Sequence, residues 1–295
     1  MCGIAGFWRD NSDQNTDWLE KTASTMANTL VHRGPDDSGT WVDREVGIAF
    51  GHRRLSIIDV SKAGHQPMVS ADGRFVITFN GEVYNFQKLR KKLEKLGHRF
   101  RGHSDTEVML ASFIEWEVEG SLKRFNGMFA FALWDRRDRL LYLARDRIGE
   151  KPLYYGVQNG TLFFGSELKA IRAHSDFAPE IDRDALASFL RFSYVPAPHS
   201  IYKGVKKLLP GHFLRFESSR SDGTPLAYWS LEDVYHRGMA EPFEGSENEA
   251  VDELEKRLKK TVKSRMVSDV PLGAFLSGGI DSSTVVALMQ SQSDR

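Results

Sequence analysis

The first 217 residues predict an α+β fold in which helices cover antiparallel sheets, and the residues after 245 predict the start of an α/β unit. Strand patterns follow one another in runs instead of alternating with helices, which disfavours βαβ units in the first part. Asn159-Gly160 is a type I′ hairpin signal between two such strands, so we expect these two to pair antiparallel. Near the carboxyl end, an apolar strand, a glycine loop and an apolar helix follow one another, as in α/β domains.

Apolar periodicity and turn residues locate the elements of the amino-terminal half. Asp17 can cap a helix whose apolar residues recur on one face, and Gly34-Pro35 follow it as a break. Asn85 is a second expected cap, for a helix that Gly97 ends. The expected elements are a helix over residues 17–31, strands over 46–50, 54–58 and 75–79, a helix after Asn85, and a helix opened by the capping box Ser104–Glu107.

The carboxyl-terminal half contains further strands, a linker and a second capping box. Strands are expected over 128–134, 140–144, 153–157 and 162–165. Residues 218–245 are polar and interrupted by Gly and Pro, so we expect a linker with a short piece of structure. The capping box Ser246–Glu249 opens a helix whose apolar stripe is Val251, Leu254, Leu258, Val262 and Met266. A strand over Leu272–Leu276 and a helix that includes 285–289 complete the prediction.

The composition excludes several classes of function. The 295 residues carry 40 Lys+Arg and 40 Asp+Glu, so the formal net charge is zero and no basic footprint for nucleic acid is expected. No apolar run approaches the roughly 20 residues of a membrane helix. The first ten residues lack the basic segment of a signal peptide. We therefore expect a cytoplasmic protein with no membrane or nucleic-acid partner.

Cys2 is the single cysteine, so we expect no internal disulfide, and with nine scattered histidines we expect no metal site. If Met1 is removed, Cys2 carries both a thiol and a free α-amine. A free thiol has a pKa of about 8.5 and an α-amine about 7.7–8.0, so moving the proton from thiol to amine costs on the order of 1 kcal/mol. Position alone leaves two interpretations open: a nucleophile that carries its own base, or a small side chain buried by chance.

Several longer motifs resemble the class II (N-terminal-nucleophile) glutamine amidotransferases, most closely the glutamine-dependent asparagine synthetases. The motifs are MCGIAG at 1–6, HRGPDDSG at 32–39, RLSIID at 54–59, NGEVYN at 80–85, SDTE at 104–107, GMFAFALWD at 127–135, ARDRIGEKPLYYG at 144–156, SELKA at 166–170 and LSGGIDSS at 276–283. The resemblance covers essentially the whole chain. It implies a four-layer αββα glutaminase domain over 1–217, a linker over 218–245, and over 246–295 the incomplete beginning of an ATP-pyrophosphatase-type synthetase domain.

The resemblance implies that Cys2 is the nucleophile of a glutaminase. The side-chain amide of Asn80 and the backbone N–H of Gly81 would form its oxyanion hole, in which one donor is typically worth about 10²–10³ in rate. Read without this context, Asn80-Gly81 is a turn dipeptide between a strand and a helix.

The same resemblance implies the groups that would hold glutamine. Arg54 would bind the substrate α-carboxylate with its planar fork, and Asp105, helped by Glu82, would bind the α-ammonium group. Read alone, Asp105 is an acid favoured by the dipole of the helix that it begins. Backbone contacts would come from the residues that follow Arg54, namely Leu55, Ser56, Ile57 and Ile58.

A second implied site would bind ATP with Mg²⁺. A glycine turn between a strand and a helix N-terminus offers backbone N–H groups to an anion. The loop does not match the GxxxxGK[ST] signature, and a plain Gly-Gly turn is the alternative interpretation. The residues expected to contact the nucleotide are Leu276, Ser277, Gly278, Gly279, Asp281 and Ser282.

The implied reaction begins with hydrolysis of glutamine to glutamate and ammonia, and the ammonia is then used for ATP-dependent amidation of aspartate to asparagine. Because most of the aspartate site would lie beyond Arg295, we expect this chain alone to act only as a glutaminase. Two alternatives stay open: an amidotransferase acting on a different carboxylate acceptor, and a non-enzymatic relative. The second is disfavoured because the sequence retains the five residues Cys2, Arg54, Asn80, Gly81 and Asp105. The expected partners are the small molecules glutamine, aspartate and ATP, and a homodimer is left open.

Overall fold

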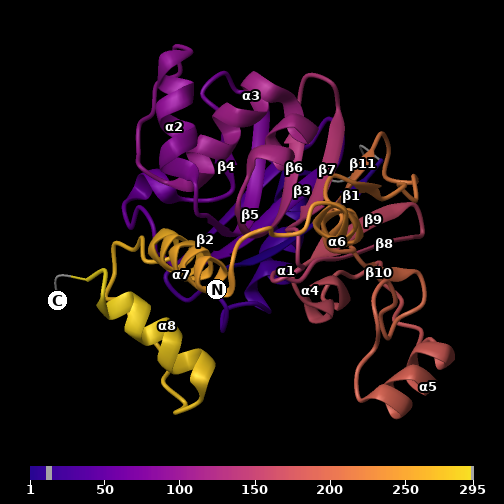
Figure 1. The fold of residues 1–295 in the computed structure, drawn as a ribbon. Helices are drawn as coiled ribbons and strands as arrows, with labels where there is room; N and C mark the ends of the chain where they lie inside the picture. The colour runs from indigo at the N-terminus through magenta and orange to yellow at the C-terminus, as the bar shows by residue number, and fades with distance from the viewer. Residues whose placement is uncertain (11–14, 294–295) are drawn as a thin grey trace. The chain divides into compact units, whose positions relative to one another are not determined.

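The computed structural model describes residues 1–10 and 15–293, which divide into two compact units. The first unit is Met1–Trp229 and the second is Ser230–Arg295 (Figure 1). The division between the units falls inside the linker expected over 218–245. Within the described residues, no helix combines the length and the apolar character needed to cross a membrane.

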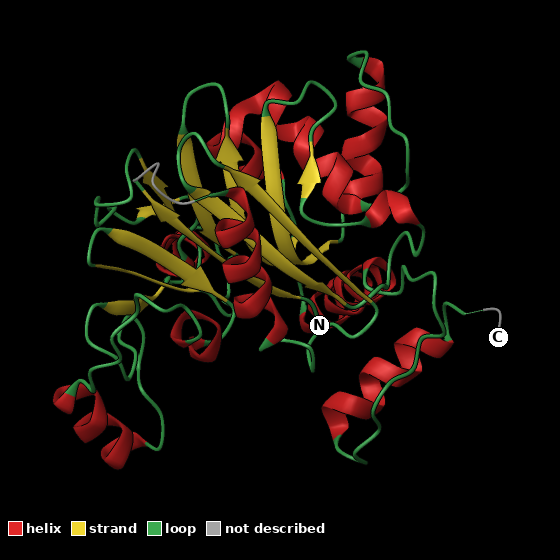
Figure 2. Ribbon diagram, turned by 180° about the vertical axis from the view of Figure 1, so that it is seen from behind, coloured by secondary structure: helices red, strands yellow, loops and turns green. Residues whose placement is uncertain are grey.

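The first unit contains two six-stranded sheets in which every strand pair is antiparallel (Figure 2). The first sheet has the order β10 (Val205–Lys207), β8 (Tyr154–Gln158), β9 (Thr161–Gly165), β1 (Gly3–Arg9), β3 (Ile48–Arg54) and β2 (Asp37–Asp43). The second has the order β12 (Leu226–Ala227), β11 (His212–Phe216), β7 (Leu140–Arg145), β6 (Gly127–Asp135), β5 (Phe75–Val83) and β4 (Met68–Val69). The predicted hairpin is confirmed, because Asn159 and Gly160 both have positive φ between β8 and β9.

The two sheets pack face to face, and helices cover their outer faces. Alternate residues of β1 serve the two sides: Trp8 packs between the sheets, 5.2 Å from Trp134 in ring centroids, while Phe7 faces outward. The outer face of the first sheet is covered by α1 (Thr16–Asn28) and α4 (Leu168–Arg172). The outer face of the second is covered by α3 (Asp105–Arg124), through Phe113, and α2 (Phe86–Lys95) packs beside α3. The resulting four layers confirm the expected αββα fold. A further helix, α5 (Arg183–Phe192), lies away from the sheets (Figure 1).

In its described residues, the second unit contains three helices: α6 (Leu231–Ala240), α7 (Glu247–Ser264) and α8 (Ile280–Gln290). The capping box is confirmed, since the Ser246 side chain accepts from the Glu249 N–H and the Glu249 carboxylate accepts from the Ser246 N–H. The strand predicted over Leu272–Leu276 is wrong, because this segment is an exposed loop. A strand needs a paired neighbour for its ladder, and the described part of this unit offers none.

Three local predictions in the first unit need correction. Helix α1 begins one residue earlier than expected, because Asn15, and not Asp17, caps it by accepting from the Trp18 N–H. The strand predicted over 54–58 is wrong, since β3 ends at Arg54 and the chain then turns, with φ +55° at Asp59. Strand β5 extends to Val83, four residues past its predicted end.

Candidate active site

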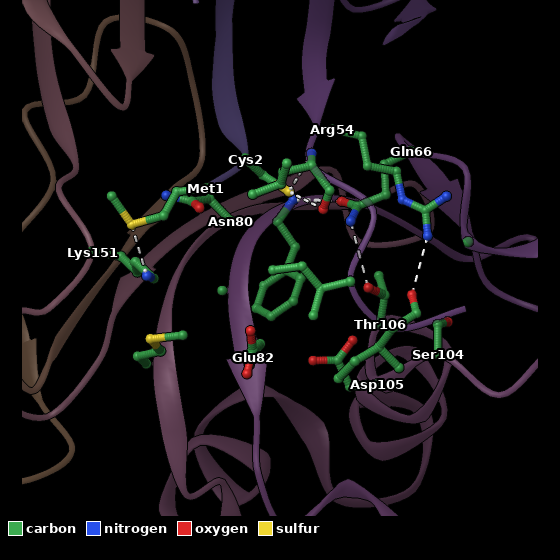
Figure 3. Close-up of a pocket in the computed structure, with 17 residues that line it drawn as sticks. Met1, Cys2, Arg54, Gln66, Asn80, Glu82, Ser104, Asp105, Thr106 and Lys151 are labelled. Atoms are coloured by element: carbon green, nitrogen blue, oxygen red, sulfur yellow. Dashed lines mark hydrogen bonds between the residues drawn. The ribbon is translucent and has the colours of Figure 1, made fainter. Parts of the chain in front are cut away.

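A small pocket of about 80 Å³ lies in the first unit where β1, β3, β5 and α3 meet (Figure 3). Its volume is far below the roughly 300–1,000 Å³ typical of sites for drug-sized ligands, so it suits a molecule of amino-acid size. The pocket brings together eight of the nine residues expected at glutamine, and also Cys2. These residues are Cys2, Arg54, Leu55, Ile57, Ile58, Asn80, Gly81, Glu82 and Asp105. Ser56 is not among the lining residues, and its N–H donates to the Asp36 carboxylate at 2.8 Å.

Cys2 precedes β1 and is held at both its sulfur and its carbonyl. The Leu55 N–H donates to Sγ at 3.4 Å, and the thiol donates to the Leu55 carbonyl at 3.6 Å. The Arg33 Nε donates to the Cys2 carbonyl oxygen at 2.9 Å. Burial raises the pKa of the Cys2 thiol, and the hydrogen bond with Leu55 only partly opposes this effect. The thiol therefore keeps its proton at neutral pH unless a base removes it.

Met1 occupies the side of the pocket next to Cys2 (Figure 3). While Met1 is present, the nitrogen of Cys2 is an amide, and the α-amine belongs to Met1. Burial is the main cause that lowers the pKa of this amine, and the charges of Arg33 and Lys151 lower it further. The buried Lys151 ammonium group donates to the Met1 sulfur at 3.0 Å.

The free edge of β5 directs one backbone donor into the pocket. Strand β4 pairs only with Val76 and Ile77, so β5 has no strand partner on this side from Thr78 to Val83. Side chains accept from two of the backbone N–H groups along this edge. The Phe79 N–H donates to Gln66 Oε1 at 2.7 Å, and the Val83 N–H donates to Asp105 Oδ2 at 2.9 Å. Alternate residues of a strand direct their N–H groups to the same edge. The Gly81 N–H, midway between these two, therefore faces the pocket.

Asn80 supplies a second donor beside Gly81. Its side chain is 1% exposed, and among the described residues its amide nitrogen Nδ2 has no hydrogen-bond partner. A buried donor without a partner costs roughly 1–3 kcal/mol, which points to a ligand that satisfies it. The turn interpretation of Asn80-Gly81 is excluded, because both residues lie inside β5 opposite Ala130 and Phe129 of β6.

Asp105 begins α3 and places a buried carboxylate in the pocket. Burial raises its pKa to about 6, the Val83 N–H opposes this rise, and the nearby charge of Glu82 adds to it. The carboxylate is therefore mostly ionised at pH 7 and can pair with a cationic group of a ligand. Glu82, on β5, lines the same side of the pocket (Figure 3).

Arg54 lies in the pocket wall, but part of its guanidinium group already binds the protein itself. The two Nη atoms donate to the carbonyl oxygens of Ile58 at 3.2 Å, Asp59 at 2.5 Å and Ser61 at 3.3 Å. These bonds curl the chain after β3 into a loop, which explains why no strand forms over 54–58. A Cβ atom on Gly64 would lie 2.0 Å from Nη2, so only glycine fits beside this group. The sequence prediction had missed this structural role of Arg54.

Sequence reasoning had also missed several residues that line the pocket. Gln66 and Thr106 are linked by a 3.5 Å hydrogen bond, and Lys151 and Met128 also line the pocket. Met128 lies in the motif at 127–135 and Lys151 in the motif at 144–156, so these two motifs could have identified them as pocket residues. Gln66 lies outside every motif, and only the fold brings it to β5.

The expected nucleotide loop lies in the second unit. Gly278 has φ +80° and open space around its Cβ position, and α8 begins after Gly279 without a side-chain cap. The hydroxyls of Ser277 and Ser282 lie 2.9 Å apart across the loop. An uncapped helix N-terminus beside open glycines is compatible with a phosphate group. Leu276 and Asp281 flank this loop and are exposed. Among the described residues, no group of three or more His, Cys, Asp or Glu side chains is arranged to hold a metal ion.

Two family profiles match the sequence, the glutamine amidotransferase domain over residues 1–229 and asparagine synthase over residues 253–295. Asparagine synthetase (glutamine-hydrolyzing) 3 of Bacillus subtilis (strain 168) is 40% identical over 98% of this chain and 45% of its own length. Asparagine synthetase (glutamine-hydrolyzing) 1 of the same organism is 40% identical over 98% of this chain and 44% of its own length. A protein named amidase chry2, of Gibberella zeae, is 33% identical over 98% and 43%. The chain thus spans less than half the length of these three curated relatives.

Solved structures resemble this chain in fold. Glutamine phosphoribosylpyrophosphate amidotransferase from B. subtilis matches with a TM-score of 0.55 and 18% identity, over 78% of this chain and 50% of that chain. At this level of identity the likeness shows the fold alone. The profile match, in contrast, covers more than half of the sequence, including every residue of the pocket. The chain therefore belongs to the glutamine amidotransferase domain family.

Proposed function

We propose that this chain hydrolyses the side-chain amide of glutamine, with Cys2 as the nucleophile once Met1 has been removed. One observation carries the proposal: the Cys2 sulfur shares a small pocket with the unpartnered Asn80 amide and the Gly81 N–H. A nucleophile and two convergent donors are what acyl transfer needs. The family membership of residues 1–229 supports it, and so do the names of the relatives.

In the proposed reaction, the α-amine of Cys2 takes the thiol proton, and the sulfur attacks the side-chain amide carbon of glutamine. Burial raises the pKa of the thiol, so this neighbouring base is needed. The negative charge that develops on the amide oxygen is stabilised by Asn80 Nδ2 and the Gly81 N–H. The α-ammonium group returns its proton to the departing nitrogen, ammonia leaves, and water then hydrolyses the thioester to glutamate.

The α-ammonium and α-carboxylate groups of glutamine would each be bound by a protein group of opposite charge. Asp105, assisted by Glu82, would pair with the α-ammonium group, because a carboxylate with a pKa of about 6 is mostly ionised at pH 7. The N–H groups of Arg54 that do not hold the loop would donate to the α-carboxylate. Backbone atoms of residues 55–58 would complete the contact.

We propose asparagine as the product of the whole protein, formed from aspartate, ATP and the released ammonia. The proposal rests on the asparagine synthase profile over 253–295 and on the names of the relatives. In it, residues 1–217 form the glutaminase domain, 218–245 the linker, and 246–295 the start of the synthetase domain. The loop Ser277–Ser282 would hold the ATP phosphates with their Mg²⁺, which supplies charge neutralisation. A cytoplasmic location remains a prediction from the sequence.

The glutaminase proposal is tested by incubating the processed chain with glutamine and measuring glutamate and ammonia. We expect equal amounts of the two products, and a thioester on Cys2 that acid quenching traps for mass spectrometry. Products in the absence of any Cys2 adduct, or an adduct on another residue, would refute the assignment. The synthetase proposal is tested with the complete gene product, in which the amide nitrogen of ¹⁵N-labelled glutamine should be recovered in the side chain of asparagine.

A further inference from the structure

The amino-terminal segment is bound to the carboxyl-terminal end of β9 by a side-chain hydrogen bond in addition to strand pairing. Strand β9 ends at Gly165, opposite Ala5. Beyond it, Ser166 continues the ladder with both its backbone and its side chain: the Ser166 N–H donates to the Ile4 carbonyl at 2.9 Å, and the Ile4 N–H donates to Ser166 Oγ at 3.0 Å. The next residue, Glu167, therefore lies alongside the start of β1, close to Cys2.

A chain of two hydrogen bonds runs from Glu167 to Cys2. The Glu167 Oε1 accepts from Arg33 Nη1 at 3.0 Å, and the Arg33 Nε donates to the Cys2 carbonyl at 2.9 Å. The Arg33 side chain is only 10% exposed, so solvent weakens this ion pair less than a surface pair. Glu167 also binds His32 Nε2 at 2.9 Å and Lys169 Nζ at 3.1 Å. Burial opposes ionisation of Glu167, but the hydrogen bonds from Arg33, His32 and Lys169 outweigh it and lower its pKa to about 2.

A nucleophile at the end of a chain needs non-covalent contacts to fix its position. Once Met1 is removed, Cys2 is covalently held on one side only, so its backbone is free to rotate unless other contacts fix it. Its sulfur is held by Leu55, and its carbonyl is held by Arg33. Without the second contact, the sulfur could leave the position from which it attacks. Because Arg33 is a long side chain, its own position depends on the carboxylate that it binds.

We propose that Glu167 is a positioning residue for the N-terminal nucleophile: it fixes Arg33, and Arg33 fixes the Cys2 carbonyl so that the sulfur faces the Asn80 and Gly81 donors. This inference rests on the proposed glutaminase function for its kinetic consequence, although the contact chain itself does not. A displacement of about 1 Å at a reacting group can cost 10²-fold in rate. The cost should fall on kcat, because the groups proposed to bind the head of glutamine lie elsewhere in the pocket.

The test compares E167Q with a matched control, D176N. Asp176 binds Arg9 Nη1 at 2.6 Å at the far end of the same strand β1, and the side chains of Arg9 and Asp176 are 30% and 28% exposed, against 27% for Glu167. Both substitutions neutralise a carboxylate that ties β1 to the segment after β9. We expect E167Q to lower kcat by about 10- to 100-fold while KM changes by less than about threefold. D176N should leave both constants within about twofold of the parent protein.

A readout that needs no glutamine separates the failure of this proposal from the failure of the proposed function. The rate of Cys2 alkylation by iodoacetamide, measured against pH, reports the ionisation of the thiol. If Cys2 loosens, the thiol loses the burial that raises its pKa as well as the Leu55 hydrogen bond that only partly opposes this rise. The profile of E167Q should therefore move to lower pH while that of D176N stays in place. A parent protein that hydrolyses no glutamine would refute the proposed function. The alkylation profile would still show whether Glu167 positions Cys2, because it needs no glutamine. Equal kcat losses in the two variants, or an unmoved alkylation profile in E167Q, would overturn the positioning role.

Discussion

Replacing Asp105 with asparagine should make the protein more stable at neutral pH and poorer at binding glutamine. The carboxylate is 4% exposed, and its pKa is raised from 3.8 to about 6, mainly by burial. The folded protein therefore keeps this proton up to about pH 6, whereas the unfolded chain releases it near about pH 4. Folding takes up a proton between these values, so this group lowers stability as the pH rises through the window. A shift of about two units corresponds to about 3 kcal/mol as an upper limit.

Thermal melting at several pH values measures this effect. For a unit of this size, about 3 kcal/mol corresponds to a gain in Tm of roughly 6–12 °C, which is expected for D105N at pH 8. At pH 4.5 about a third of this gain should remain, because the unfolded carboxyl is already mostly ionised there while the folded one is protonated. The Asn side chain can still accept from the Val83 N–H, so the start of α3 should remain intact. Asp146 provides a control of opposite sign, because its buried carboxylate accepts backbone N–H bonds from Phe129 and residues 148–151, and D146N should lower Tm.

Two melting results would contradict a burial penalty at Asp105. A Tm for D105N that equals the parent value at pH 8 would show that burial does not penalise the carboxylate. A gain that is the same at pH 4.5 and pH 8 would show that the gain has another origin. In the same samples, saturating glutamine should raise the Tm of the parent protein but not that of D105N, because the proposed partner of the α-ammonium group is lost.

Three further predictions concern the proposed nucleophile and the proposed oxyanion hole. C2A should abolish glutamate release and leave Tm nearly unchanged, and activity within a few-fold of the parent would refute the assignment of Cys2. Protein that retains Met1, identified by intact mass, should be nearly inactive, because the nitrogen of Cys2 is then an amide and a general base is typically worth about 10²–10⁴ in rate; equal turnover by the two forms would show that another group is the base. N80A should lower kcat by about 10²–10³ with a smaller change in KM, since the buried Nδ2 atom is proposed to act on the transition state. A loss confined to KM would instead assign Asn80 to substrate binding.

Features with a local cause were predictable from the sequence. The capping box at Ser246 and Glu249 and the turn at Asn159-Gly160 depend on neighbouring residues only, and the structure confirms both. Strand β1, in contrast, was not predicted. Six of its seven residues are buried, because β1 lies between β3 and β9 with covered faces on both sides, so its sequence shows no alternation of polar and apolar residues.

Some of the pocket residues were predictable from sequence motifs, and others depend on tertiary contacts. The motifs were sufficient to name Cys2, Asn80 and Asp105, and the structure places all three in one pocket. The contact of Gln66 with the Phe79 N–H and the commitment of Arg54 to the following loop are tertiary interactions. No spacing or composition signal encodes them, because they depend on where β5 lacks a strand neighbour and on how the chain leaves β3.

The short length of β4 has a consequence for association with other chains. An unpaired stretch of strand edge is a template to which a strand of another molecule can add, and natural proteins protect such edges. Here the stretch from Thr78 to Val83 is partly protected by side chains, since Gln66 and Asp105 accept from two of its three outward N–H groups. Substitutions at these two positions would thus uncover the backbone donors of Phe79 and Val83, two residue types that favour strands. The edge of this sheet that borders the pocket is thus also an edge at which another strand could add if these side chains were lost.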